Sequence, residues 1–429
     1  MMKRALLLLS LLAVPCVLTS YMAEAAPSTD TAAPGTDAAT VSPLDKLCKL
    51  LKLYGYSDAE IKIFRAGYTG NTATLENLKG KNHIGIYCEG AAAAGNKELV
   101  LQCLDKGADP NKGLDIAADY GHMEIVQLLL DKGATDYNAG LWGAAKGGHM
   151  EIVQLMLDKG ADPSHGLSYA AQGGHMEIVQ LLLSKGATDY VRGLIGAAYG
   201  GHMEIVQLML DKGATNYNDG LEGAVRGGHM DIVQLMLDKG ANPDWGLWVA
   251  ARGEHMDIVQ LLLDKGATDY DSGLYFAALG GHMDIVQLML SKGAIDYNGG
   301  LKGAAKGGHM EIVKLMLSKG ATAYDSGLHF AAWGGHMDIV RLLLSKGATD
   351  YNHGLWGAAQ GGHMDIVQLM LDKGAHPDAG LEGAAVGGNF DIVQLMLDKG
   401  ATNLDSALDE AESNGHTKCA ELIRAAMKK

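Results

Sequence analysis

The sequence is poor in cysteine, in positive charge and in long apolar runs. Five cysteines in 429 residues are too few for a disulfide framework. The net charge of −15 argues against nucleic acid or an anionic membrane as the main partner, because both attract clusters of Lys and Arg. After residue 25, no stretch reaches the roughly 20 apolar residues of a membrane helix. We therefore expect a mature chain that does not insert into a membrane and is stabilised by packing.

The sequence also lacks the motifs of common enzymes. It contains no G-x-S-x-G, no G-x-x-x-x-G-K-[ST] and no H-E-x-x-H, and its carboxylates recur at the same repeat positions, as solvated helix ends would. Cys88 and Cys103 align with Leu114 and Leu129, which predicts either buried thiols or one local disulfide. We expect no enzymatic activity, no cofactor and no metal site.

The N-terminal region divides into three parts before the repeats begin. Residues 1–25 combine Lys3 and Arg4, an apolar run and the A-x-A site ending at Ala25, which predicts a signal peptide and export to the periplasm or the medium. Residues 26–43 are small and polar, as in a disordered linker. Residues 44–86 carry apolar side chains at helical spacing and predict an N-terminal helical cap with one degenerate repeat.

A repeated unit fills the remainder of the chain, residues 87–429. Its most regular letters are a Gly-His or Gly-Asn pair that recurs every 26 or 27 residues. A fixed period of this length is typical of a solenoid, in which each unit buries its apolar face against its neighbours. The second residue of the pair, with His255 after Glu254 in the same series, is Asn96, His122, His149, His175, His202, His229, His255, His282, His309, His336, His363, Asn389 and His416.

Each repeat predicts two short helices. In one copy, residues 138–147 place Leu141, Ala144 and Ala145 on one stripe, and residues 151–157 form a second apolar segment that ends at Lys159 and Gly160. The histidine begins the second helix, where its ring can bond to the backbone of a neighbouring turn. We favour this structural role over a metal ladder, because helices stack about 8–10 Å apart and zinc ligands lie about 2 Å from one ion.

Two positions of the repeat vary together. Most repeats with Gly at the position of Gly143 carry Met at the position of Met156, whereas most repeats with a bulky residue there carry Leu. Because interior volume is nearly constant, we expect the two positions to be in contact, with Met as a core residue.

The segment "AAQGGHMEIVQLLLSKGA" and its copies resemble the core of an ankyrin repeat. The resemblance covers residues 87–429, but the period is shorter than usual, T-P-L-H is missing and the region of the β-hairpin finger is shortened. It implies an all-α, ankyrin-like α-solenoid of about 12–14 helix pairs, with β-hairpin fingers shortened or absent and the last repeat acting as a C-terminal cap.

The repeats differ mainly at two positions of the first helix, the residue after Gly-Leu and the residue four places later, which share a helix face. The residue before Gly-Leu joins this face, and the varied positions hold all five tryptophans. The resemblance implies that first helices line a concave, partner-facing surface. The predicted partner-binding residues are Trp142, Tyr199, Trp245, Trp248, Arg252, Tyr275, Lys306, His329, Trp333, His353 and Trp356. Because four of the five tryptophans fall within residues 245–360, we expect the main site there.

These features favour a monomeric, exported, non-enzymatic scaffold that binds a protein partner through its aromatic concave face. Two alternatives remain open, a structural or spacer protein of the cell envelope and a secreted effector that acts on a host by binding.

Overall fold

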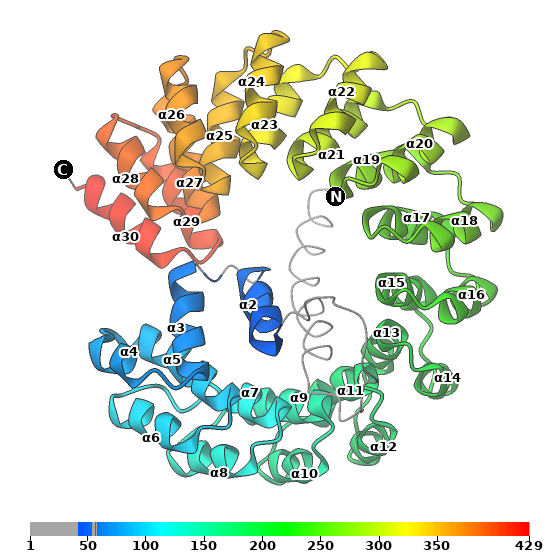
Figure 1. Cartoon of the computed structure of the whole chain (residues 1–429), viewed down its shortest axis with the longest axis vertical. Helices are drawn as coiled ribbons and strands as arrows, with labels where there is room; N and C mark the ends of the chain where they lie inside the picture. The colour runs from blue at the N-terminus through cyan, green and yellow to red at the C-terminus, as the bar shows by residue number, and fades with distance from the viewer. Residues whose placement is uncertain (1–41, 54–55, 57, 429) are drawn as a thin grey trace, which may run out of the picture. The chain divides into compact units, whose positions relative to one another are not determined.

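The chain is described by a computed structural model that covers residues 42–53, 56 and 58–428 (Figure 1). These residues form helices and connections without a strand. The predicted signal peptide lies outside the described residues, as does the predicted linker up to residue 41. The chain falls into two compact units, unit 1 ending at Gly240 and unit 2 beginning at Ala241.

Unit 1 contains the N-terminal helices and the first repeats. Its described helices are α2 (Pro43–Leu53), α3 (Asp58–Tyr68), α4 (Thr72–Asn77), α5 (Lys81–Ala93), α6 (Lys97–Asp105), α7 (Leu114–Asp119), α8 (Met123–Asp131), α9 (Tyr137–Gly147), α10 (Met150–Asp158), α11 (Pro163–Gln172), α12 (Met176–Ser184), α13 (Tyr190–Gly200), α14 (Met203–Asp211), α15 (Tyr217–Gly227) and α16 (Met230–Asp238).

Unit 2 continues the same alternation of first and second helices. Its helices are α17 (Pro243–Arg252), α18 (Met256–Asp264), α19 (Tyr270–Gly280), α20 (Met283–Lys292), α21 (Tyr297–Gly307), α22 (Met310–Ser318), α23 (Tyr324–Gly334), α24 (Met337–Ser345), α25 (Tyr351–Gly361), α26 (Met364–Asp372), α27 (Pro377–Gly387), α28 (Phe390–Asp398), α29 (Leu404–Ser413) and α30 (Thr417–Ala426). Within each unit, odd-numbered first helices from α7 onward form one layer and even-numbered second helices the other (Figure 1).

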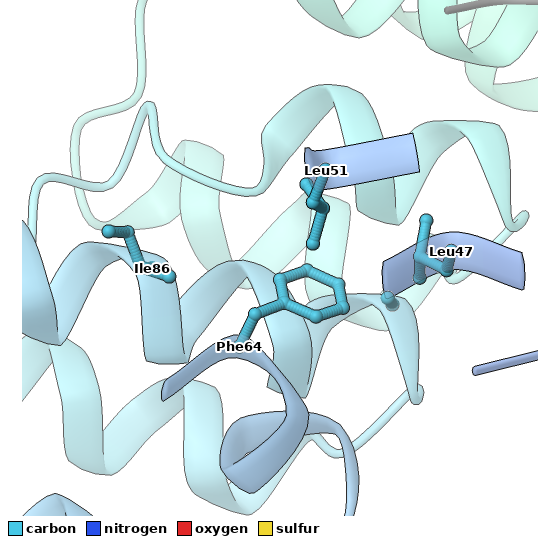
Figure 2. Packing of buried hydrophobic residues seen from close by; sticks show 5 residues of the cluster. Leu47, Leu51, Phe64 and Ile86 are labelled. Atoms are coloured by element: carbon cyan, nitrogen blue, oxygen red, sulfur yellow. The ribbon is translucent and has the colours of Figure 1, made fainter. Parts of the chain in front are cut away.

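The predicted N-terminal cap residues form α2 to α4 and the first half of α5. Leu47 and Leu51 of α2 lie beside the ring of Phe64 of α3, with Ile86 of α5 on its other side (Figure 2). Partly buried residues of the next repeat, including Tyr120, pack against this cluster. Helix α2 therefore covers the first-helix layer at the start of unit 1.

The predicted helix pair of each repeat is confirmed by α9 and α10. Asp136 caps α9 by accepting a hydrogen bond from the backbone N–H of Ala139 at 3.1 Å. Leu141 of α9 and Ile152 of α10 are buried in the shared core. The second helix ends before Gly160, which has a φ of +100° that favours glycine.

The repeated Gly-Gly-His sequence joins each repeat to the next. Nε2 of His149 donates a hydrogen bond to the carbonyl oxygen of Asp119 in the preceding first helix, at 2.9 Å. Gly148 has a φ of +80°, and a Cβ atom there would lie 2.5 Å from the ring of His175 in the following repeat. The predicted backbone role is confirmed for all of the described histidines of the series except His255, which makes no such bond. The ring of His122 lies 3.4 Å from the carbonyl oxygen of Ala93, and shorter bonds are made by His175, His202, His229, His282, His309, His336, His363 and His416.

A second set of inter-repeat hydrogen bonds lies at the opposite end of the first helices. Oδ1 of Asn111 accepts the backbone N–H groups of Thr135 and Asp136, at 2.8 and 2.9 Å. Asp271 and Asn298 bind the next connection in the same way in unit 2. These side chains satisfy connection N–H groups that would otherwise need another partner, so neighbouring connections are joined without a β-hairpin.

The nearest neighbours of Gly143 and of Met156 differ from the contact that we expected between them. Sδ of Met156 lies against Gly140, where a Cβ atom would be 2.5 Å from it. A Cβ atom on Gly143 would instead overlap the carbonyl oxygen of Asp115 in α7. Gly143 therefore allows two neighbouring first helices to approach closely, and Met156 fills space beside Gly140, a glycine that most repeats share.

The histidine row predicts that acid weakens the fold. Burial lowers the pKa of His202 and of His309 below the ordinary value of 6.5. The unfolded chain therefore binds more protons below about pH 6.5, so the stabilisation is complete above that pH and is lost as pH falls through the lower folded pKa. We expect the urea midpoint to fall between about pH 7.5 and about pH 5.

A natural substitution supplies the control for this prediction. Asn389 occupies the histidine position, and its Nδ2 donates to the carbonyl oxygens of Ala359 and Gln360 at 2.7 and 3.0 Å. The double variant His202→Asn/His309→Asn should keep the bonds and show a smaller pH dependence. An unchanged pH dependence would mean that these rings do not carry the effect.

Glu254 replaces the second glycine of one Gly-Gly-His segment and predicts a stabilising substitution. Among the described residues it is the one non-glycine with positive φ, at 65°. This conformation costs an L-residue roughly 1 kcal/mol relative to glycine. Glu254→Gly should therefore raise the free energy of unfolding by about 1 kcal/mol, measured by urea denaturation. A lower stability would show that the weak contact of its carboxylate with His282, 3.9 Å away, matters more than the backbone strain.

Candidate functional site

The predicted partner-binding residues lie on first helices and are divided between the two units. Trp142 is on α9 and Tyr199 on α13, both in unit 1. The unit 2 stripe, as we name the other nine, consists of Trp245, Trp248, Arg252, Tyr275, Lys306, His329, Trp333, His353 and Trp356. Arg252 and His353 are exposed, and the other members are half-buried.

One aromatic cluster of the stripe joins α17 to α19. The ring of Trp248 lies 5.4 Å from that of Trp245, edge to face, and 5.0 Å from that of Phe276 on the next first helix. Tyr275 meets Phe276 edge to face at 5.0 Å. The rings in contact hold one another in position while part of each indole stays accessible, an arrangement that suits contact with a partner.

The second aromatic cluster joins α23 to α25 around His329. Its ring centre lies 5.4 Å from that of Trp356, 5.9 Å from that of His353 and 6.4 Å from that of Trp333. Nδ1 of His329 lies 3.0 Å from the carbonyl oxygen of His353. Burial lowers the pKa of His329, so a neutral ring is favoured in this cluster.

Positive charge lies between the two clusters. Nζ of Lys306 on α21 is 3.6 Å from the ring centre of Trp333, a cation–π contact. Burial lowers the pKa of Lys306, and the nearby charge of Arg252 lowers it further. In the part of the chain that the structure describes, no carboxylate pairs with Arg252, Lys302 or Lys306 within 4.0 Å. Charge of one sign is therefore left without a counterion here.

In unit 1, the cations at the same varied positions are paired with carboxylates of unit 1 itself. Nζ of Lys146 lies 2.9 Å from a carboxylate oxygen of Asp119, and both side chains are almost fully buried. Arg226 pairs with Glu222 along α15 at 2.7 Å. The ring of Trp142 lies 5.2 Å from that of Tyr169 on the next first helix, as the ring of Trp248 lies 5.0 Å from that of Phe276 in unit 2, so the aromatic contacts do not distinguish the two units. In unit 1, one varied cation therefore joins two neighbouring first helices, and another is paired within its own helix.

Sequence reasoning missed the part played by two phenylalanines. Phe276 and Phe330 occupy the position of Gly143 in their repeats and were not among the predicted partner-binding residues. The structure leaves them half-buried within the aromatic clusters, where the ring of Phe330 is 6.1 Å from that of Trp333. The repeat of Phe276 carries Met289, whereas most repeats with a bulky residue at this position carry Leu. This departure was the signal available in the sequence.

The four described cysteines, Cys48, Cys88, Cys103 and Cys419, are buried free thiols. No group of three or more possible metal ligands occurs in the described residues. Among the described helices, none is long and apolar enough to cross a membrane.

Comparison with known proteins identifies the repeat. A search of curated proteins found no match. The family described as "Ankyrin repeats (3 copies)" matches overlapping segments that together run from residue 89 to residue 380. The first matched segment, residues 89–166, has the length of three repeats of about 26 residues, which agrees with a family model of three copies. Ankyrin repeats are in general protein–protein interaction modules and typically non-enzymatic. The family match and the helix pairs together show that this chain belongs to the ankyrin repeat family.

Proposed function

We propose that the chain is a non-enzymatic scaffold that binds a protein partner through the unit 2 stripe. The observation that carries this proposal is the contrast between a constant frame and a varied face. Residues that recur in each repeat form the core and the inter-repeat hydrogen bonds, whereas the stripe holds partly exposed aromatic rings and cations without counterions. Aromatic and Arg side chains are enriched in the energetic centres of protein interfaces.

The contacts of the tryptophans with neighbouring aromatic rings fit this role and also stabilise the fold. Trp248 covers the space between α17 and α19, and Trp356 covers the space between α23 and α25. A spacer protein would need such rings only for packing, and smaller apolar side chains would suffice. Rings that are already held in place lose little conformational freedom on binding, which favours affinity.

Capture of the partner tests the proposal. The wild-type chain and the variant Trp248→Ala/Trp333→Ala/Trp356→Ala are immobilised and exposed to envelope and extracellular fractions of the source cells. Phe390→Ala is the matched control, because Phe390 is an exposed aromatic residue of the second helix α28. We expect a protein that is retained by the wild type and the control and lost from the triple variant. Equal retention by all three would contradict the proposed site.

We also propose that the chain is exported after cleavage at Ala25, on the evidence of its charged, apolar and A-x-A segments. The intact mass of the protein from envelope or extracellular fractions should correspond to a chain that begins at Ala26. A cytoplasmic chain that retains residues 1–25 would contradict export.

A further inference from the structure

The unit 2 stripe has an order of chemical groups along the repeats. The aromatic cluster of α17 and α19 comes first, the cations of α21 follow, and the aromatic cluster of α23 and α25 comes last. Arg252 adds a further positive charge near Lys306, close enough to influence its protonation. Along the unit 2 stripe, positive charge therefore lies between two groups of aromatic side chains.

The stripe itself contains no carboxylate to neutralise this charge. At the two varied positions of α17, α19, α21, α23 and α25 the residues are Trp248, Arg252, Tyr275, Leu279, Lys302, Lys306, His329, Trp333, Trp356 and Gln360. Carboxylates do occur at the N-terminal turns of these helices. There Asp271 and Asp325 each accept two backbone N–H groups of the next connection, so they serve the frame.

The positive charge is also unusual for this chain. The net charge is −15, and the cations at equivalent positions of unit 1, Lys146 and Arg226, are both paired with carboxylates. Partial burial makes the unpaired charge of Lys306 costly unless a partner supplies the counterion. The contrast with unit 1 indicates that the counterion of Lys306 belongs to the ligand, and the exposed guanidinium of Arg252 is accessible to the same ligand.

We propose, resting on the proposed function, that the unit 2 stripe binds an extended acidic segment of a protein partner. One or more carboxylates of this segment lie over Arg252 and Lys306, and apolar or aromatic side chains on either side contact the two aromatic clusters. Neighbouring first helices are about 8–10 Å apart, so the four steps from α17 to α25 match an extended segment of about 10–12 residues.

Nucleic acid also carries negative charge, but the strongly acidic chain disfavours it. A nucleic acid needs neutralisation at many phosphates, whereas the stripe offers two cations, Arg252 and Lys306, among aromatic rings. A short acidic peptide satisfies these few cations without bringing a long run of charge against an acidic protein.

A peptide-display selection on the full chain tests the inference. The probe is a random library of about 12 residues per peptide, selected on the wild type and on the variant Arg252→Gln/Lys306→Gln. The matched control is Arg341→Gln/Lys346→Gln, which removes two exposed cations of the second helix α24 and its C-terminal cap position in the same unit. Circular dichroism verifies that each variant is folded.

Support for the inference requires two results. Peptides selected by the wild type and the control should be enriched in Asp or Glu flanked by apolar residues, and a synthetic copy should bind Arg252→Gln/Lys306→Gln about tenfold more weakly. Lys306→Met, which keeps the apolar stem over Trp333, should also weaken binding. A single-stranded oligonucleotide of similar length should not compete with the peptide.

Other results would overturn it in distinguishable ways. If the selected peptides are not enriched in Asp or Glu but lose binding to the Trp248→Ala and Trp333→Ala variants, the ligand is not acidic and the proposed binding site still stands. If the tryptophan variants bind the selected peptides as the wild type does, the proposed site itself is contradicted. Competition by the oligonucleotide at equal concentration would replace an acidic protein segment with nucleic acid as the ligand.

Discussion

Lys146→Met should lower the free energy of unfolding by about 3 kcal/mol. Nζ of Lys146 lies 2.9 Å from Asp119, and the two side chains are only 6% and 11% exposed. The variant keeps the apolar stem but leaves the Asp119 carboxylate buried without its counterion, which is far more costly than losing an exposed ion pair. Urea denaturation of the full chain, followed by circular dichroism, measures the change.

Two variants separate the effect of burial from that of losing a lysine. Lys314→Met removes an ion pair of similar length, 2.8 Å to Glu311, whose side chains are 57% and 75% exposed. It should cost less than about 1 kcal/mol. Asp119→Leu added to Lys146→Met should restore much of the loss, because no charge is then buried. If Lys146→Met and Lys314→Met are equally mild, the pair does not hold α7 and α9 together.

Trp333→Ala should weaken partner binding by about 1–3 kcal/mol, the range of an interface hot spot. Trp333 connects the cation of α21 with the aromatic cluster of α23 and α25. Nζ of Lys306 lies over its ring, and the rings of Phe330 and His329 lie beside it. Its removal deprives the partner of an aromatic contact and frees Lys306 to move. Titration of the captured partner, or of its peptide, against wild type and variant measures the loss.

The control for Trp333→Ala is Trp142→Ala in unit 1, which should leave affinity nearly unchanged. Both tryptophans are half-buried first-helix residues, so each variant loses ring contacts within the fold of about 1 kcal/mol. The account requires the two variants to be similar in stability and different in binding. Equal affinity losses would show that the stripe in unit 2 is not distinguished from the rest of the first-helix layer.

The helix pairs and the inter-repeat hydrogen bonds could be predicted from the sequence, because the residues that form them recur at the same position in most repeats. Gly160 and its counterparts mark the helix ends, and His149 and its counterparts mark the inter-repeat bonds. The nearest neighbours of Gly143 and Met156 were not predicted from their co-variation. Co-variation indicated that both positions respond to the spacing of helices, but it did not show that Met156 lies against Gly140 and that Gly143 faces Asp115 of α7.

The candidate site was predictable only in outline. The varied positions indicated one face of the first helices, because residues four apart share a helix side. Their pairing across repeats was not apparent: Asp119 and Lys146 form a buried ion pair, whereas Lys306 contacts Trp333. Whether a varied lysine forms an ion pair or a cation–π contact depends on which side chain lies at the varied position of the adjacent first helix. Comparing the same varied position in adjacent repeats would have predicted the first pair.

Hydroxyl-radical footprinting of the chain, free and bound to its captured partner, tests the central claim most directly. Oxidation of each tryptophan is read by mass spectrometry, and all five occupy varied positions. Met364 and Phe390, 41% and 43% exposed on second helices, report on the opposite layer. The account predicts protection of Trp245, Trp248, Trp333 and Trp356, with Trp142, Met364 and Phe390 unchanged. Protection of Met364 or Phe390, with the four unit 2 tryptophans oxidised as in the free chain, would contradict it.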